Sequence, residues 1–197
     1  MIQFPLPEDV IERTLTRSEW RLEFQIAQSS TRHAIRKLES RQNYLEPGNP
    51  SWEAWIAGYE KRAQALAEAN RAEQAGVLRP LEDRGVSFIR VHVLEYPLTP
   101  YIRFELDHYR ISSELGEQIF LVDRSDIEDI ESQESLQDFI LFDESRALVE
   151  KFSSEGLLLG GALVRDRDYL AWMADLHDSL RKRGTTYEAF RERLTPL

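Results

Sequence analysis

Hydrophobic residues recur at helical spacing in the first part of the chain. Thr16 and Glu19 have the spacing of a capping box and predict the start of a helix. A second helix is predicted from Thr31 to Arg41, and the proline- and glycine-containing stretch from Tyr44 to Pro50 then ends the helical pattern. A third helix, ending near Gly76, is predicted from a stripe of apolar residues with the helical period. The members of this stripe are Trp52, Trp55, Ile56, Tyr59, Ala63 and Leu66.

The pattern changes to alternation in the middle of the chain. From Phe88 to Glu95 the side chains alternate between two faces, which predicts a β-strand. Thr99 and Pro100 suit an N-cap and a first helical position, so a helix is predicted from there to about Gly116. A second strand is predicted from Gln118 to Asp123. Two strands joined by a helix form a βαβ unit, in which the strands are parallel.

Three further hydrophobic stretches follow, with short polar connections between them. They cover 138–143, 147–152 and 157–164, and the short connections favour an antiparallel meander. Asp166 is the predicted N-cap of a long helix that ends near Gly184. A short helix is predicted after it, near the end of the sequence.

Together these elements predict the α+β class. N-terminal helices precede a mixed five-stranded sheet, formed by the βαβ unit and the meander, and further helices follow at the C-terminal end. The region 1–84 is expected to be helical and to pack with the mixed α+β domain, 85–197, as one compact unit. A chain of this length buries enough surface on folding to need no disulfide or metal for its core.

The composition is that of an ordinary globular protein without cysteine. Of 197 residues, 42% are hydrophobic and 30% are charged, which argues against global disorder. The absence of cysteine excludes disulfides, thiolate metal sites and a cysteine nucleophile, and it fits a reducing compartment. No apolar run approaches the roughly 20 residues that cross a bilayer, and the first residues lack a signal-peptide pattern. We therefore predict a cytoplasmic protein without a membrane partner.

The charge balance bears on the choice of partner. The formal net charge is −10, which disfavours nucleic acid, because phosphate binding requires a basic face. Much of the excess lies between Asp123 and Glu144, where nine acidic residues accompany one base, Arg124. This acidic segment is interpreted either as a solvated loop or as a docking surface for a basic partner protein.

The predicted middle helix carries the most informative polar residue. A charged stripe that includes Arg103 belongs in water, whereas Glu105 lies between the two apolar flanks on the opposite side. A carboxylate that faces the interior must be neutralised, hydrogen-bonded or used. Its nearest candidate partners along the helix are Tyr101, His108 and Tyr109.

Three interpretations of Glu105 stay open. The first is a buried hydrogen-bond hub that ties the helix to the preceding strand by way of Arg90. The second is a ligand pocket lined by Glu105 together with Tyr101, Tyr109 and His108. The third is a general acid/base.

Two more acidic residues, Glu95 and Asp123, end the two parallel strands. Ligands of open α/β sheets bind beyond the carboxyl ends of strands, and two acids there are able to hold a magnesium ion. Strand-end acids are common without a metal, however, and the four histidines lack metal-ligand spacing, so we assign no metal and no cofactor. Catalytic residues stay unassigned. The predicted ligand-binding residues are Glu95, Tyr101, Arg103, Glu105, Tyr109 and Asp123.

The stretch from Glu95 to Glu105, EYPLTPYIRFE, resembles the signature of an actinobacterial family catalogued as a domain of unknown function. The signature is Glu-x-Pro-Leu-Thr-x-Tyr-x-Arg-Phe-Glu, and the resemblance covers roughly 85–183, with the acidic stretch 126–134 as an apparent extension. Members of that family are often encoded near helix-turn-helix regulators. By association, the resemblance implies a regulatory or partner-binding role, and it implies no activity.

Three functional hypotheses follow, and the last of them is RNA or tRNA handling through the arginines of the N-terminal stretch from Arg13 to Arg41. The first is a non-enzymatic cytoplasmic regulatory module that binds a small ligand or a partner protein, either a helix-turn-helix regulator or another basic protein. The alternative is an enzyme acting on a small or phosphorylated substrate, with Glu105 as acid/base and with Glu95 and Asp123 holding a metal. The aromatic helix from Trp52 to Leu66 suits a homodimer seam as well as an intramolecular core.

Overall fold

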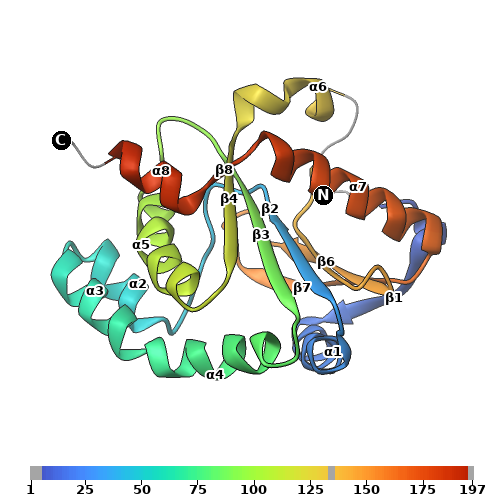
Figure 1. The fold of residues 1–197 in the computed structure, drawn as a ribbon, viewed down its shortest axis with the longest axis horizontal. Coiled ribbons are helices and arrows are strands. Elements are labelled where there is room, and N and C mark those ends of the chain that lie inside the picture. Colours follow the sequence, from blue (N-terminus) through green and yellow to red (C-terminus); the bar gives the residue numbers. More distant parts are fainter. Residues whose placement is uncertain (1–5, 133–135, 195–197) are drawn as a thin grey trace.

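The computed structural model describes residues 6–132 and 136–194. A mixed β-sheet runs through the middle of this structure (Figure 1). Its strands are β1 (Ile11–Thr16), β2 (Ala34–Glu39), β3 (Ser87–Leu94), β4 (Gln118–Asp123), β5 (Phe139–Phe142), β6 (Arg146–Phe152), β7 (Leu158–Val164) and β8 (Thr185–Thr186). The α-helices are α1 (Arg17–Ser30), α2 (Pro50–Ile56), α3 (Glu60–Ala69), α4 (Arg71–Glu82), α5 (Pro100–Glu114), α6 (Glu128–Glu131), α7 (Arg167–Arg183) and α8 (Tyr187–Leu194). Two short 3-10 helices are η1 (Glu8–Val10) and η2 (Arg124–Ile127).

The order of the strands across the sheet is β1-β7-β6-β5-β2-β3-β4-β8. The pairs β2–β3 and β3–β4 are parallel, and the other neighbouring strands are antiparallel. The predicted α+β class with a mixed sheet is confirmed, as are the βαβ unit β3-α5-β4 and the meander β5-β6-β7. The prediction of five strands is wrong, because the described residues form a sheet of eight, and the predicted order of helices and strands is also wrong.

Two of the additional strands lie in the part of the chain that was predicted to be helical. The predicted helix from Thr31 to Arg41 is wrong, since β2 occupies that segment and pairs with β3 on one side and β5 on the other. The residues of β2 have good intrinsic helix propensity, and pairing with distant strands overrides it. The strand β1 pairs with β7 at the edge of the sheet, and the short β8 pairs with β4.

Local signals at helix starts were reliable. The Thr16 hydroxyl accepts a hydrogen bond from the Glu19 amide, and the Glu19 carboxylate accepts one from the Thr16 amide at 2.8 Å, which completes the capping box of α1. The Thr99 hydroxyl accepts from the amide of Ile102 at the start of α5, with Pro100 in the first turn. The Asp166 carboxylate caps α7 in the same way.

The predicted third helix is broken into α2, α3 and α4. Gly58 has a φ of +81°, in the left-handed region, and turns the chain between α2 and α3. As a result the aromatic stripe is discontinuous, and Ile56 and Tyr59 are each 62% exposed. The N-cap of α2 is Asn49, whose side chain accepts hydrogen bonds from the next two amides of the helix.

The two faces of the sheet are covered differently. On one face, Leu170 and Met173 of α7 pack against alternate strand residues such as Val91 and Val93. The opposite face carries two separate apolar clusters. One cluster packs α1 and α4 against the sheet, and the other packs α5 and α8 against β4. The candidate site lies between these two clusters.

In the described part of the chain, none of the helices has both the length and the apolar character needed to span a membrane.

Candidate functional site

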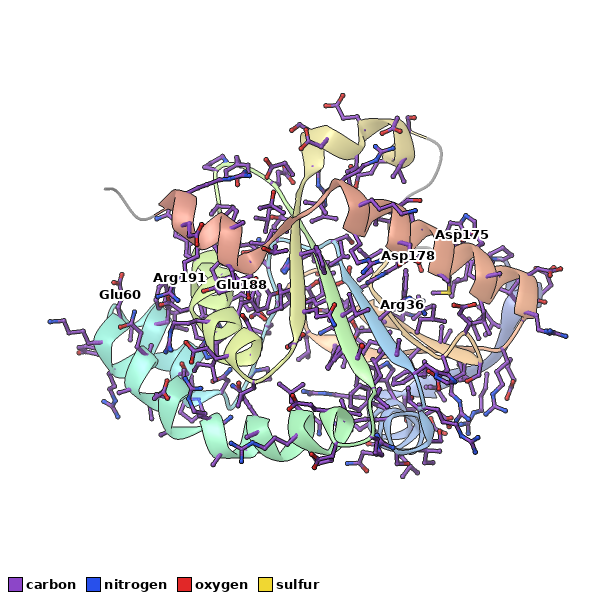
Figure 2. All side chains as sticks on the ribbon, viewed as in Figure 1. Arg36, Glu60, Asp175, Asp178, Glu188 and Arg191 are labelled. Atoms are coloured by element: carbon purple, nitrogen blue, oxygen red, sulfur yellow. The ribbon has the colours of Figure 1, made fainter. Side chains whose placement is uncertain are left out.

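Side chains of β2 point alternately to the two faces of the sheet. The guanidinium of Arg36 points toward α7, where it lies 3.9 Å from the carboxylate of Asp178 (Figure 2). Lys37 and Glu39 belong to the opposite face, where the Lys37 ammonium lies 2.7 Å from the Glu39 carboxylate. Charged residues therefore occupy a sheet face that is otherwise covered by apolar clusters. We call these side chains and their neighbours from β3 and β6 the polar band: Lys37, Glu39, Arg90, His92 and Glu150.

Arg90 of β3 is the hub of the polar band. Its Nε donates a hydrogen bond to Glu117 at 2.6 Å, and its Nη1 donates one to Glu39 at 2.7 Å. The same Nη1 lies 3.7 Å from the carboxylate of Glu105 on α5. The guanidinium also stacks over the ring of Tyr109, 5.0 Å from its centroid. Although burial opposes the charge, these carboxylates raise the pKa of Arg90 well above its usual value.

A chain of buried hydrogen bonds extends from this hub. The Tyr109 hydroxyl donates to the Glu39 carboxylate at 3.0 Å and lies 2.6 Å from Nδ1 of His92. Burial lowers the pKa of His92, with the Glu39 charge acting in the opposite direction. For Glu39 itself, burial is outweighed by the charges of Arg90 and Lys37, and its pKa lies well below the usual value. Glu39 is therefore the ionised anchor of the band.

Glu105 faces this network from α5. Its side chain is 15% exposed, so the carboxyl is turned away from bulk solvent. Burial, reinforced by the neighbouring carboxylates of Glu39 and Glu46, raises the pKa of Glu105 to about 8. A side chain with this pKa is mostly protonated at neutral pH and is able to donate a proton or a hydrogen bond.

A second carboxyl with a raised pKa comes from β6. Burial raises the pKa of Glu150 to about 7, and the charge of Lys37 limits the shift. Nearby, the Tyr44 hydroxyl donates a hydrogen bond to the buried carboxylate of Asp138, which also accepts from Ser40. The charge of Lys37 on β2 thus acts on Glu150 of β6 across the intervening β5.

A cavity of about 460 Å³ opens onto the polar band. Both acidic and basic groups line it, together with aromatic rings and the loop that precedes α2. Its charged lining residues are Arg17, Lys37, Glu39, Glu46, Arg90, Glu105 and Glu150. A second cavity of about 340 Å³ lies between α3, α5 and α8, but among the described residues that line it no acidic or basic side chain is buried. The chemistry therefore points to the first cavity.

The predicted ligand-binding residues separate into two groups. Tyr101 and Glu105 line the cavity, and Tyr109 is buried beside it in contact with Arg90 and Glu39. The other three are not part of the cavity lining: Arg103, Glu95 and Asp123.

Each of the three residues outside the cavity has a local explanation. Arg103 is exposed on the solvent side of α5. Glu95 is exposed, and its carboxylate lies 3.8 Å from Arg124. Asp123 accepts a hydrogen bond from the hydroxyl of Tyr96. Across 6–132 and 136–194, no three carboxylate or histidine side chains gather in a way that would hold a metal ion.

The acidic segment is largely engaged in contacts within the protein. The Asp143 carboxylate accepts hydrogen bonds from three consecutive backbone amides before β2, and Asp138 is buried. Three more of its acids form ion pairs with arginines, namely Asp129 with Arg183, Glu131 with Arg124 and Glu144 with Arg36. Glu134 lies outside the described residues.

The sequence interpretation missed Lys37, Glu39 and Glu150. Lys37 and Glu39 were assigned to a helix, on which their shared face with Arg90 cannot be recognised. Once the segment is assigned to a strand, the positions 35, 37 and 39 share one face, and two of them are charged. Charged residues on the inner face of a central strand are the signal that would have indicated the site.

Two solved structures are weakly similar to this chain. The phospholipase D family member Nuc from Salmonella typhimurium is 11% identical, with a TM-score of 0.45 over 85% of this chain and 90% of that chain. The archaeal chromatin protein TrmBL2 is 10% identical, with a TM-score of 0.47 over 94% of this chain and 57% of that chain. Neither likeness bears on function, and no curated protein sequence matches the chain. Residues 22–192 match the family described as Domain of unknown function (DUF6879), and the chain belongs to that family.

Proposed function

We propose that this protein binds a small polar ligand in the cavity beside Glu105. The observation that carries the proposal is the polar band itself, in which buried charged groups open onto a cavity of about 460 Å³. Pockets that bind small molecules are concave and carry a few converging polar groups, and titratable residues with shifted pKa values gather there. Glu105 and Glu150 are two such residues in one wall.

A purely structural role explains the polar band less well. Buried ion pairs contribute little net stability, because desolvation offsets the attraction, and apolar residues of similar size often stabilise a protein more. The neighbouring apolar clusters on this face could have been joined into one by apolar residues at 37, 39, 90 and 150. Retention of charge at these positions therefore supports binding of a ligand.

Thermal unfolding in the presence of small polar compounds tests this proposal. The panel contains amines, amino acids, organic acids, sugars and nucleosides, and the wild-type chain is compared with Leu158→Trp. Leu158 is a half-buried residue of the cavity wall, so the larger ring should fill the cavity. We expect at least one class of compound to raise the Tm of the wild type but not that of the variant. No rise for any class, or an equal rise in both chains, would contradict the proposal.

The raised pKa of Glu105 supports a second candidate function, that of an enzyme in which this residue is a general acid/base. A carboxyl with a pKa of about 8 is protonated at neutral pH and is suited to proton donation. The metal-assisted form of this hypothesis has less support, because Glu95 and Asp123 are absent from the cavity lining. Turnover of a bound compound, followed by NMR, would be abolished in Glu105→Gln while binding persists.

The remaining parts of the functional hypothesis are proposals that rest on the sequence. They are the regulatory role, the cytoplasmic location, the actinobacterial origin, and a helix-turn-helix or other basic protein as partner. The homodimer seam on α2 and α3 is a further proposal, and the exposure of Ile56 and Tyr59 supports it. A measured mass in solution equal to that of one chain would count against the homodimer.

A further inference from the structure

We propose that the ligand of this cavity is an organic cation that carries a primary ammonium group. The inference rests on the proposed function and adds the chemical class of the ligand. Two features of the cavity wall carry it independently: carboxyls that lack a close cation, and an aromatic wall beside them.

The cations of the polar band are already neutralised by other carboxylates. Lys37 lies 2.7 Å from Glu39, and Arg90 donates its two short hydrogen bonds to Glu39 and Glu117. The carboxylate of Glu105 lies 3.7 Å from Nη1 of Arg90, which is longer than a hydrogen bond. Among the described residues, Glu150 has no ion pair within 4.0 Å. Two carboxyls in one cavity wall are thus left without a directly bonded positive group.

An aromatic wall adjoins these carboxyls. The ring of Tyr44 lies 5.2 Å from that of Tyr101 and 5.2 Å from that of Phe152, and all three residues line the cavity. The wall already receives one cation, since the guanidinium of Arg41 stacks over Phe152 at 5.3 Å. Aromatic faces attract ammonium groups and also pack against the methylene groups that carry them.

Other ligand classes fit this wall less well. An anion would add negative charge beside Glu39 and Glu46, and two of the three basic residues that line the cavity, Lys37 and Arg90, are already held by carboxylates. A metal ion would require a set of close oxygen or nitrogen ligands, and no such group exists among the described side chains. An ammonium group suits a carboxyl of this kind, because it carries the missing positive charge and donates up to three hydrogen bonds.

Binding of a cation should also release protons. Near neutral pH the raised pKa values of Glu105 and Glu150 leave these carboxyls partly or mostly protonated, and a bound cation favours their ionised forms. The groups that bear on the titration of Glu105 come from the strands, α5 and the loop before α2, and they are Glu39, Arg90, Tyr101 and Glu46.

The test compares three four-carbon probes by calorimetry and thermal unfolding: putrescine, its uncharged diol analogue and succinate. We expect putrescine alone to bind, and we expect proton release when the titration is repeated in buffers of different ionisation enthalpy. Glu105→Gln and Glu150→Gln should each weaken putrescine binding by at least about tenfold, because each removes one charged hydrogen bond in a cavity. Glu82→Gln removes an exposed carboxylate of α4 and should leave affinity unchanged.

The outcomes separate the inference from the function on which it rests. One outcome is that the diol or succinate binds at least as tightly as putrescine, with binding lost in Leu158→Trp. That result would contradict a cationic ligand but would still support a ligand site in this cavity. Failure of all three probes and of the wider panel would overturn both. Equal putrescine affinity in all three glutamine variants would show that putrescine binds elsewhere. It would also contradict the proposal that the ligand of this cavity is an organic cation. Circular dichroism of each variant verifies that it is folded.

Discussion

At the scale of single residues, the site is distinguished by charged side chains that are buried together with their ion-pair partners. Arg90 is held by two nearly buried carboxylates, Glu39 and Glu117, whereas Arg71 forms a comparable set of ion pairs with Glu68 and Glu114 on the surface. The same kinds of side chain should therefore contribute very differently to stability. Solvent screens the surface set, whereas water is unable to replace Arg90 beside the buried carboxylates.

Arg90→Ala should lower the free energy of unfolding by about 3–5 kcal/mol, because it leaves buried Glu117 without a cation and Glu39 with Lys37 alone. Arg71→Ala is the matched control and should cost much less, because solvent screens its ion pairs. Urea unfolding followed by circular dichroism measures both. Equal costs for the two substitutions would mean that the polar band is as well hydrated as the surface.

The protonation of Glu105 predicts a pH-dependent difference between the wild type and Glu105→Gln. Between the unfolded pKa near 4.5 and the folded value of about 8, the folded chain holds a proton that the unfolded chain has lost. This residue's contribution to stability is therefore complete at low pH and is lost as the pH rises to about 8. Glu105→Gln has no ionisable carboxyl at this position and therefore lacks this pH dependence.

The stability of the variant relative to the wild type should consequently increase with pH across this window, by up to about 1.4 kcal/mol per pH unit. Urea unfolding at a series of pH values gives the difference directly, and the titration of Glu150 is common to both chains. A difference that does not change with pH would show that the carboxyl of Glu105 is ionised throughout.

At the scale of elements, helix starts were predictable because their signals are local. The hydroxyl of Thr16, the hydroxyl of Thr99 and the carboxylate of Asp166 each cap the helix predicted from a few neighbouring residues. The strand β2 was not predictable in the same way, since its stability comes from β3 and β5, which follow it in sequence by about 50 and 100 residues. Close packing between strands is a further property that a local pattern does not reveal.

Gly161 of β7 illustrates this packing and gives a prediction. A Cβ at Gly161 would lie 2.0 Å from the carbonyl oxygen of Val149 on the neighbouring β6. Gly161→Ala should therefore destabilise the protein by about 1–3 kcal/mol or more, because two paired strands would have to separate. Gly76→Ala on α4 is the opposite case, since a Cβ there meets nothing within 4 Å.

Gly76→Ala should stabilise the protein by about 0.5–1 kcal/mol, the usual gain for alanine within a helix. Thermal unfolding of the two variants side by side measures both changes. If Gly161→Ala were tolerated as well as Gly76→Ala, the register between β6 and β7 would have to differ from the one described.

At the scale of the whole molecule, the site results from the way helices cover the sheet. One face is covered by α7, and α1, α4, α5 and α8 lie on the other (Figure 1). There, α1 with α4 and α5 with α8 form two apolar clusters, and the polar band lies between them. The inward position of Glu105 and its nearness to Arg90 were predictable from the helical wheel. The rest of the cavity was not, because Lys37, Glu39 and Glu150 come from segments that only the sheet brings together.

The most direct test is to titrate the Glu105 carboxyl with and without putrescine, following the chemical shift of its carboxyl carbon by NMR. We expect a midpoint near pH 8 for the free protein, and we expect this midpoint to fall when the cation binds. In Glu82→Gln the same two midpoints should be observed. A midpoint near the usual glutamate value of about 4.3, unchanged by the probe, would contradict the enclosed cavity and the ligand assigned to it.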